Sequence, residues 1–485
     1  MGPAISSEGG LVNGTSDLTG PGVHGQGQLQ GLGAGGCIPG WVLAFAHRFR
    51  TPLRVAFAHY SSADDISGVS SWLLRFATFL RQQHVDVGVH LLNLAASADL
   101  ASPLELALRE AGVETFKSPQ TPHLKTDVQA TLSFLNAWQP DVFLPQCKSP
   151  HYIAAAIAGR SGLPWVLTLH SDDPDYWAVV ESLPPQGSGG KAVCVSRHIQ
   201  AQLVHHGGEA DALVIPCGVA IPDRAAIHHT RPFRVVYCGR LWDHQKRITL
   251  VVQSLIHACQ HPDVEIVATV IGEGYGRQAC EQLVQEAGLG DRITFVGLQP
   301  FAAIQTILLE SQAILLMSDF EGLPVALLEG MAAGVVPVAR SIPSGIPELV
   351  QDQETGLLVG ESPEEAGAAL ARLAKDSALW QHCSDQARTL VETAYSEVIS
   401  NQKWLNCLLE LEKISAPSYL IRGFNQFDFS RLSPLLTLPY KKKSSLQSLQ
   451  LKRRARTKLA RLKGGLKQWL QTDSTRDASN PSRDP

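Results

Sequence analysis

The sequence lacks any long apolar run, and it lacks the cysteine spacing of a metal or disulfide site. No stretch reaches the about 18 apolar residues that a membrane-spanning helix needs, so we expect none. The nine cysteines are scattered, odd in number and contain no Cys-x-x-Cys pair. They are typical of core thiols in a reducing compartment. Together with 44% hydrophobic and 18% charged residues, these absences predict a cytoplasmic globular protein.

Charge is scarce at the start of the chain. Residues 1–40 are rich in Gly, Ser and Gln and hold almost no charged side chains. Such a stretch cannot bury enough apolar surface to fold, so we expect residues 1–50 to form a disordered extension. It also lacks the basic start and continuous apolar core of a signal peptide.

Charge is also unevenly divided. Residues 441–485 hold 13 Lys and Arg against 3 Asp and Glu, a balance of +10. The totals of 41 and 45 therefore leave 28 and 42 for residues 1–440, a balance of −14. Within residues 441–470 leucines recur mostly three and four apart among the cations, a pattern that suits an interfacial helix on an anionic membrane surface. A solvated basic tail or a nucleic-acid contact is the alternative; we expect no nucleic acid.

Strand-like and helix-like segments alternate from residue 53 onward. A chain of 485 residues is too long for one core and suits two domains with extensions. Alternation of this kind predicts an α/β fold with doubly wound parallel sheets. We expect a first domain over residues 51–221, a linker over 222–232 and a second domain over 233–393. The strands expected in the first domain are 53–59, 87–92, 141–145, 165–170 and 192–195, with a helix over 68–82.

One unit, residues 313–339, organises the second domain. Residues 313–317 are a short apolar run that predicts a buried parallel strand. Pro324 suits a first helical position, Gly334 suits the residue that follows a helix, and residues 336–339 form the next strand. The helix N-terminus then lies at the carboxyl edge of the sheet, where such sheets bind ligands.

Two carboxylates mark this unit, Glu321 in the loop and Glu329 in the helix, with seven residues between them. The free backbone N–H groups from residue 322 to 326 and the helix dipole suit a diphosphate. Carboxylates would repel that diphosphate, so they should face neutral hydroxyls, one on a sugar and the other on a ribose. The alternative is that Glu321 favours the helix start and Glu329 is an exposed helix residue; spacing alone leaves both open.

The residues around this pair resemble the signature of glycosyltransferase family 4. That resemblance implies the GT-B fold, two Rossmann-like domains facing across a cleft, and a retaining, metal-independent transfer from a nucleotide sugar. It covers about residues 53–414, with a last helix over 394–415 that crosses back to the first domain and a linker and basic tail over 416–485. The matching residues are Ser318, Glu321, Gly322, Pro324, Leu328, Glu329, Met331, Gly334, Pro337, Val338, Gly345, Ile346, Pro347, Glu348 and Gly356.

Two cations stand where a leaving diphosphate would need them. The strand that ends at Gly239 is followed by Arg240, and Lys246 comes six residues later. Fixed cations stabilise charge on a departing nucleoside diphosphate by about 3 kcal/mol each, Arg as a planar fork and Lys as a point charge. The family pattern has Gly after the lysine, where this sequence has Arg247. For Lys246 the alternative is a surface cation.

Candidates from the first domain are fewer. His170 ends a predicted strand at the ligand edge, and the resemblance implies that it contacts the donor sugar; a core or capping histidine is the alternative. Asp172 and Asp173 could bind acceptor hydroxyls or cap the following helix. Gly68 matches part of the glycine pair that the family carries near the acceptor. Cys217 replaces the family's Asn in residues 215–219.

The resemblance implies a site made from both domains. Arg240 and Lys246 would take the diphosphate, Glu329 the ribose, and Glu321 with the backbone of Gly322, Leu323, Pro324 and Val325 the sugar, while His170 reaches across as the second catalytic group. Residues 271–277 and 296–298 would flank the nucleotide. The acceptor would be a glycan or lipid-linked sugar, with no cofactor and no metal, since the one Asp-x-Asp, residues 173–175, lies in the first domain. A non-catalytic binding subunit, a 2-epimerase and a phosphorylase are the competing functions.

Overall fold

The computed structural model describes residues 52–62, 67–94, 101–183, 189–229, 231–412 and 419–437. The predicted disordered extension of residues 1–50 and the predicted interfacial helix of residues 441–470 lie outside these ranges. Every contact below lies within the compact unit Phe49–Pro485.

The first domain is built on a seven-stranded sheet in which every paired strand runs parallel to its neighbour. The strand order is β3-β2-β1-β4-β5-β6-β7. The strands are β1 (Arg54–Ser61), β2 (Asp86–Asn93), β3 (Glu114–Pro119), β4 (Val142–Pro145), β5 (Trp165–Leu169), β6 (Gly190–Cys194) and β7 (Leu213–Val214).

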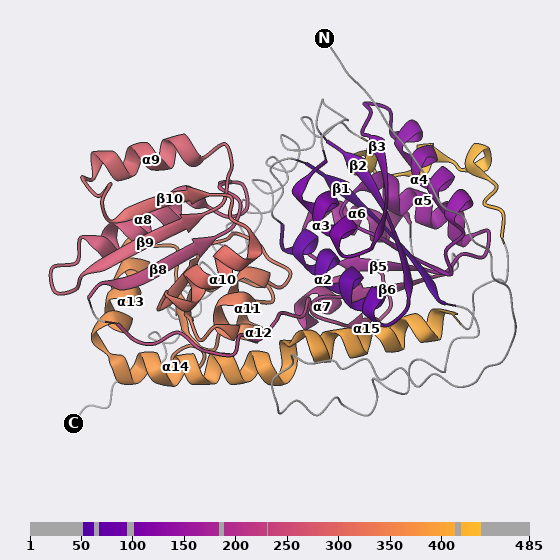
Figure 1. The fold of residues 1–485 in the computed structure, drawn as a ribbon. Coiled ribbons are helices and arrows are strands. Elements are labelled where there is room, and N and C mark those ends of the chain that lie inside the picture. Colours follow the sequence, from indigo (N-terminus) through magenta and orange to yellow (C-terminus); the bar gives the residue numbers. More distant parts are fainter. Residues whose placement is uncertain are drawn as a thin grey trace, which may run out of the picture. The chain divides into compact units, whose positions relative to one another are not determined.

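Helices cover this sheet on both sides (Figure 1). They are α2 (Gly68–Gln82), α3 (Pro103–Glu110), α4 (Leu124–Trp138), α5 (Ser149–Gly159), α6 (Pro174–Ser182) and α7 (Arg197–His205). The helix expected over residues 68–82 is α2, and it begins there because the Ser67 side chain accepts a hydrogen bond from the backbone N–H of Ser70.

The second domain has a six-stranded parallel sheet of order β10-β9-β8-β11-β12-β13. Its strands are β8 (Phe233–Cys238), β9 (Ile266–Ile271), β10 (Ile293–Gly297), β11 (Ala313–Leu316), β12 (Val336–Arg340) and β13 (Leu357–Val359). Its helices are α8 (Ile248–Cys259), α9 (Arg277–Glu286), α10 (Phe301–Leu309), α11 (Val325–Ala332), α12 (Ile346–Leu349), α13 (Pro363–Lys375) and α14 (Ser377–Leu390).

Both sheets are doubly wound, which confirms the predicted fold class, GT-B. In each, the strand order reverses beside the first strand of the domain, between β1 and β4 and between β8 and β11. Ligands of such sheets bind beyond the carboxyl ends of the strands at this reversal. The chain therefore places the loops after β8 and β11, which carry Arg240, Lys246 and Glu321, at one point.

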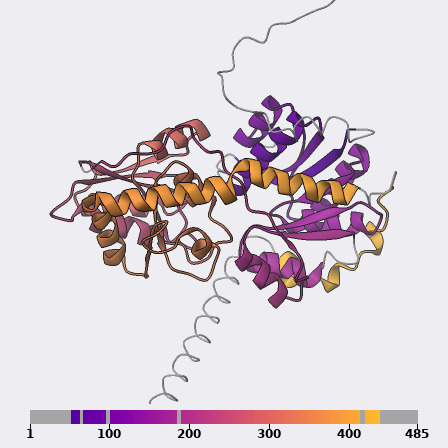
Figure 2. The same ribbon diagram turned by 90° about the horizontal axis from the view of Figure 1, so that it is seen from below.

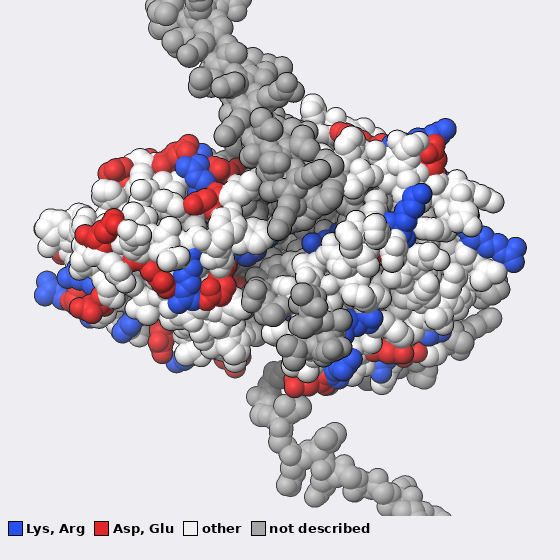
Figure 3. Space-filling model, turned by 90° about the horizontal axis from the view of Figure 1, so that it is seen from above, with Lys and Arg blue, Asp and Glu red and all other residues white. Residues whose placement is uncertain are grey.

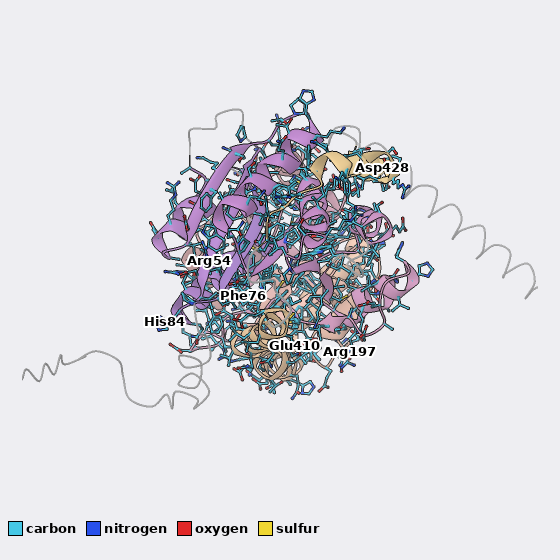
Figure 4. The ribbon with its side chains drawn as sticks, turned by 90° about the vertical axis from the view of Figure 1, so that its right-hand side faces the viewer. Arg54, Phe76, His84, Arg197, Glu410 and Asp428 are labelled. Atoms are coloured by element: carbon cyan, nitrogen blue, oxygen red, sulfur yellow. The ribbon has the colours of Figure 1, made fainter. Side chains whose placement is uncertain are left out.

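The chain returns to the first domain after α14. A π-helical turn η1 (Val391–Tyr395) joins α14 to α15 (Glu397–Glu412), and Figure 2 shows the two long helices following one another. On the first domain, the indole of Trp404 lies 5.5 Å from the ring centroids of both Trp72 and Phe76, and Lys191 pairs with Glu410 at 2.8 Å. Phe76 and Glu410 are labelled in Figure 4.

A short segment then continues along the first domain. Residues 419–437 contain two 3₁₀ turns and α16 (Pro434–Thr437). The Tyr419 hydroxyl donates to the Pro140 carbonyl at 2.7 Å, and the Ile421 N–H donates to the Asn136 side chain at 2.9 Å. Asp428, also labelled in Figure 4, caps the second 3₁₀ turn.

Some elements differ from the sequence prediction. The prediction missed β3 and β7, because both lie at the ends of the sheet order and edge strands need no continuous apolar run. Pro324 precedes α11 as its N-cap instead of opening it. Gly334 does follow the helix, with a left-handed φ of 76°.

The described cysteines form no disulfide and are buried or half-buried, as predicted for core thiols. No helix in the described part of the chain is both long and apolar enough to cross a membrane.

Candidate functional site

Lys246 and Glu321 form an ion pair at the strand-order reversal of the second sheet. The Lys246 Nζ atom lies 2.6 Å from Glu321 Oε1, and the two side chains are 14% and 7% exposed. Lys246 comes from the loop after β8 and Glu321 from the loop after β11. The alternative of an unattached surface cation is therefore wrong for Lys246, and Glu321 does more than favour a helix start.

Arg240 lies on the same edge and is held on several sides. Its backbone carbonyl accepts a hydrogen bond from the Tyr237 hydroxyl at 2.9 Å. Its guanidinium lies 4.6 Å from the centroid of the Trp242 ring, and its Nη2 donates to the Gln245 side-chain oxygen at 2.7 Å. In the described ranges no carboxylate lies within ion-pair distance of Arg240.

The start of α11 faces the first domain closely. A Cβ atom placed on Gly322 would lie 2.1 Å from the His170 carbonyl oxygen, and one on Gly68 would lie 3.0 Å from the Val325 side chain. The Ser196 hydroxyl donates to the Gly322 carbonyl at 3.0 Å. The predicted backbone residues, including the buried Leu323 and Pro324, thus meet the predicted first-domain residues Gly68 and His170.

His170 is an uncharged, oriented side chain. Its Nε2 lies 2.7 Å from the Gln146 side-chain oxygen, which makes that nitrogen the N–H donor. Nδ1 lies 3.7 Å from Cys217 Sγ, and the ring lies 5.3 Å from that of Trp72. Burial lowers the pKa of His170 to about 3, because a charged imidazolium loses its hydration there.

Glu329 contacts the first domain through an ion pair that the sequence did not predict. Its Oε1 lies 3.2 Å from Arg75 Nη1 of α2, and the side chains are 16% and 15% exposed. Arg75 also pairs with Glu397 at the start of α15 at 2.8 Å and donates to the Gly218 carbonyl at 3.2 Å. Burial raises the pKa of Glu329, with Arg75 opposing that rise. Glu329 is therefore not the exposed helix residue of the alternative.

A pocket lies beside Glu329. Its walls are otherwise mostly apolar, and they combine α10, α11 and the linker between the domains. The lining residues are Ala220, Pro222, Phe301, Ile304, Gln305, Leu308, Glu329 and Ala333.

Both candidate aspartates, Asp172 and Asp173, already have partners within the fold. Asp173 is the N-cap of α6 and accepts from the Asp175 N–H at 2.9 Å, as the capping alternative predicts. Asp172 accepts from the Trp177 indole N–H at 2.7 Å and lies 3.2 Å from His198 Nε2. The structure thus gives Asp172 and Asp173 contacts within the fold, and an acceptor role for them stays a prediction.

Arg247 occupies the position where the family pattern has Gly, and its backbone explains that preference. Its φ is 52°, in the left-handed region that glycine adopts without strain. The Arg247 side chain pairs with Asp319 and with Glu361, each at 3.0 Å. Arg340 pairs with the same two acids, so the four side chains close a ring of alternating charge around the loop that carries Glu321.

The start of α9 contacts the loop after β9 and the strand β10. Arg277 pairs with Glu273 and donates to the Phe295 carbonyl at 3.3 Å. The exposed Tyr275 ring stacks 5.7 Å from that of Trp242. Among the described residues, no group of three or more His, Cys, Asp and Glu side chains is arranged to hold a metal ion.

Sequence reasoning missed the residues that hold the site together. Arg75 and Glu329 are 254 residues apart, and Ser196 and Gly322 are 126 apart. Gln245 lies between the candidates Arg240 and Lys246, and no motif in the sequence singles it out. Such partners leave no local signal, since each is defined by where the other domain or loop lies.

Two family models match the chain, each over one domain. Residues 66–221 match the model described as Glycosyltransferase Family 4, and residues 232–376 match that described as Glycosyl transferases group 1. Together these ranges cover more than half of the sequence.

Named relatives agree over part of their length. The amylovoran biosynthesis glycosyltransferase AmsK of Erwinia amylovora is 35% identical over 195 residues, which are 39% of this chain and 47% of the relative. The N-acetyl-alpha-D-glucosaminyl L-malate synthase of Bacillus anthracis is 34% identical over 160 residues, 32% of this chain and 40% of the relative. The chain thus spans less than half the length of these two relatives.

Solved structures share the fold. Anabaena HepE in complex with UDP-glucose aligns with a TM-score of 0.62 and 18% identity, over 74% of this chain and 100% of that one. The sucrose-phosphate synthase of Thermosynechococcus elongatus aligns with a TM-score of 0.62 and 17% identity, over 75% of this chain and 100% of that one.

Proposed function

Because the chain belongs to glycosyltransferase family 4, we propose that it transfers a sugar from a nucleotide diphosphate sugar to a hydroxyl of an acceptor, with retention at the anomeric carbon. One observation carries this proposal: the uncompensated Arg240 lies on the same sheet edge as the Lys246–Glu321 pair and the start of α11. Cations and free N–H groups at one point suit a diphosphate.

Each site residue has a role in this proposal. Arg240 and Lys246 stabilise the negative charge that grows on the diphosphate as the glycosidic bond breaks. Glu321 and the backbone from Gly322 to Val325 hold the sugar hydroxyls. Glu329 takes the ribose hydroxyls.

The acceptor hydroxyl attacks on the face from which the diphosphate leaves, and a phosphate oxygen takes its proton. The bond from the anomeric carbon to the diphosphate oxygen breaks as the bond to the acceptor oxygen forms. The uncharged His170 ring accepts a hydrogen bond from a sugar hydroxyl through Nδ1, since its Nε2 donates to Gln146. No divalent metal is required in this proposal, because the diphosphate charge is met by Arg240 and Lys246.

A glycan or a lipid-linked sugar is the acceptor class that we favour. AmsK, which by its name serves amylovoran biosynthesis, is among the relatives, as is a lipopolysaccharide 1,6-galactosyltransferase of Escherichia coli, 25% identical over 244 residues. The acceptor would approach through the first domain, whose sheet edge carries His170. A purely binding subunit is the competing function; the paired Lys246 and Glu321, with an Arg240 that has no paired carboxylate among the described residues, favour catalysis.

The test is ligand NMR of the purified protein with UDP-, GDP-, ADP- and dTDP-sugars in EDTA. We expect saturation transfer to one donor and its slow hydrolysis without metal. The donor that binds identifies the nucleotide base that the protein recognises. If the folded protein neither bound nor hydrolysed any of these nucleotide sugars, the result would contradict the proposal and favour the binding subunit.

We also propose that residues 441–470 attach the protein to an anionic membrane surface. The eleven cations of residues 441–467 support this, each worth about 1 kcal/mol near such a surface. On the face drawn in Figure 3, described Lys and Arg side chains are scattered among acids instead of forming one patch. Deleting residues 441–485 should abolish co-sedimentation with phosphatidylserine vesicles at 0.15 M salt; unchanged co-sedimentation would contradict the attachment.

A further inference from the structure

Three consecutive residues of the loop after β8 bond to three consecutive residues of the loop after β11. Lys246 pairs with Glu321 at 2.6 Å, and Arg247 pairs with Asp319 at 3.0 Å. The Asp319 N–H donates to the Gln245 carbonyl at 2.8 Å. The two loops are therefore joined as one unit.

The Gln245 side chain extends this junction to Arg240. Gln245 is 9% exposed. Its amide nitrogen donates to the Phe320 carbonyl at 3.2 Å, and its amide oxygen accepts from Arg240 Nη2 at 2.7 Å. One planar group thus fixes the guanidinium relative to the backbone next to Glu321.

The neutrality of this amide matters as much as its geometry. A carboxylate in its place would also accept from Arg240, but it would cancel the guanidinium charge that a diphosphate requires. Lys246 is already neutralised by Glu321. Arg247 is likewise paired with Asp319. Arg240 is therefore the cation of these two loops that, among the described residues, has no paired carboxylate, and Gln245 orients it without neutralising it.

We propose that Gln245 is a positioning residue of the donor site, which holds Arg240 in the orientation and charge state that bind a nucleoside diphosphate and couples it to the Glu321 loop. The inference rests on the proposed function, because it needs a diphosphate ligand. It extends the donor site to a residue that touches no substrate.

The test compares Gln245→Glu and Gln245→Met with the wild type in calorimetric or NMR binding of UDP and of uridine. If the donor panel selects another base, GDP with guanosine or ADP with adenosine replaces that pair. Gln353→Glu is the matched control, because the Gln353 amide oxygen also accepts from an arginine, Arg372, at 2.6 Å on an exposed surface outside the candidate site.

We expect Gln245→Glu to weaken UDP binding at least about tenfold, because the new carboxylate neutralises Arg240 and so weakens a charge-assisted bond between Arg240 and the diphosphate. Uridine binding should change less than about twofold, since uridine has no phosphate. Gln245→Met, which loses both hydrogen bonds without adding charge, should weaken UDP binding by a smaller factor. Gln353→Glu should bind both ligands as the wild type does.

Three outcomes would overturn the inference. Wild-type UDP affinity in Gln245→Glu would show that the amide is irrelevant to the arginine. Equal losses for UDP and uridine would show a general structural role, as would losses matched by a lower melting temperature in both Gln245 variants. Absence of any nucleotide binding by the wild type would remove the proposed function itself and this inference with it.

Discussion

Replacing Glu321 by Gln should lower the turnover number for sugar transfer at least about a hundredfold, the loss seen when one group that stabilises a transition state is removed. Glu321 is 6% exposed and buried with its only paired cation in the described chain, Lys246. Gln keeps the shape and still accepts from Lys246, so the fold should persist. The donor should bind at least as well, because Lys246 then has no carboxylate opposing the diphosphate.

Comparing the change in the turnover number with the change in the KM for the donor identifies the role of Glu321. A lower turnover number with an unchanged or lower KM for the donor means that Glu321 acts on the reacting sugar. Glu321→Ala should abolish transfer too, although it leaves Lys246 buried without a partner. Glu354→Gln, at an exposed carboxylate that pairs with His382, is the control. Near-normal turnover in Glu321→Gln would remove this residue from the catalytic site.

Stability should fall steeply in mild acid, because several histidines are buried without charge. Burial lowers the pKa of His59 and of His170 to about 3 and that of His90 to about 4. Burial also holds the pKa of His151 well below its ordinary value. In the unfolded chain these rings take up protons near pH 6.5, while the folded protein does not take them up until far lower pH.

The unfolded state therefore binds more protons below pH 6.5, and stability is lost as the pH falls from there toward about 4. Each such ring contributes about 1.4 kcal/mol per pH unit. The fully buried His59 and His90 together should cost about 3 kcal/mol between pH 6.5 and 5, against a typical total of about 5–15 kcal/mol; the half-buried His170 adds to this loss. Glu329 and Glu397, whose pKa values burial raises, oppose part of this loss.

Urea unfolding at pH 7.5, 6.0 and 5.0 measures the effect. The His90 Nε2 atom lies 3.1 Å from the Ser118 hydroxyl oxygen. In the variant His90→Gln, the glutamine should keep a hydrogen bond to that hydroxyl, and its side chain cannot be protonated. This variant should show a pH slope smaller by about one proton, whatever its absolute stability. An unfolding free energy at pH 5.0 equal to that at pH 7.5 would contradict the prediction.

The architecture and the central pair could be predicted because their signals are local. One apolar run, one proline and one glycine indicate the strand, loop and helix of residues 313–334. The structure contains this strand as β11 and this helix as α11. The elements that escaped prediction, β3 and β7, are edge strands. Their residues face water on one side, so periodicity gives little indication of them.

The partners across the domains could not be predicted. The family resemblance assigned Glu329 to a ribose, and nothing near Arg75 in the sequence indicates that an arginine of α2 would reach it. The same holds for Asp172, whose carboxylate meets the indole of Trp177 and the ring of His198. Such contacts depend on how separate elements dock, and docking is not periodic in sequence.

The π-turn and α15 have a consequence for building hybrid enzymes. Val219, near the end of the first domain, accepts from the Glu397 N–H at 2.9 Å and donates to the Tyr395 carbonyl at 3.1 Å, so the chain leaves and re-enters that domain at one place. The second domain is in effect an insertion with neighbouring ends. A graft that exchanges the second domain should therefore use two crossovers, near residues 220 and 396, and leave α15 with residues 419–437 beside their original first domain.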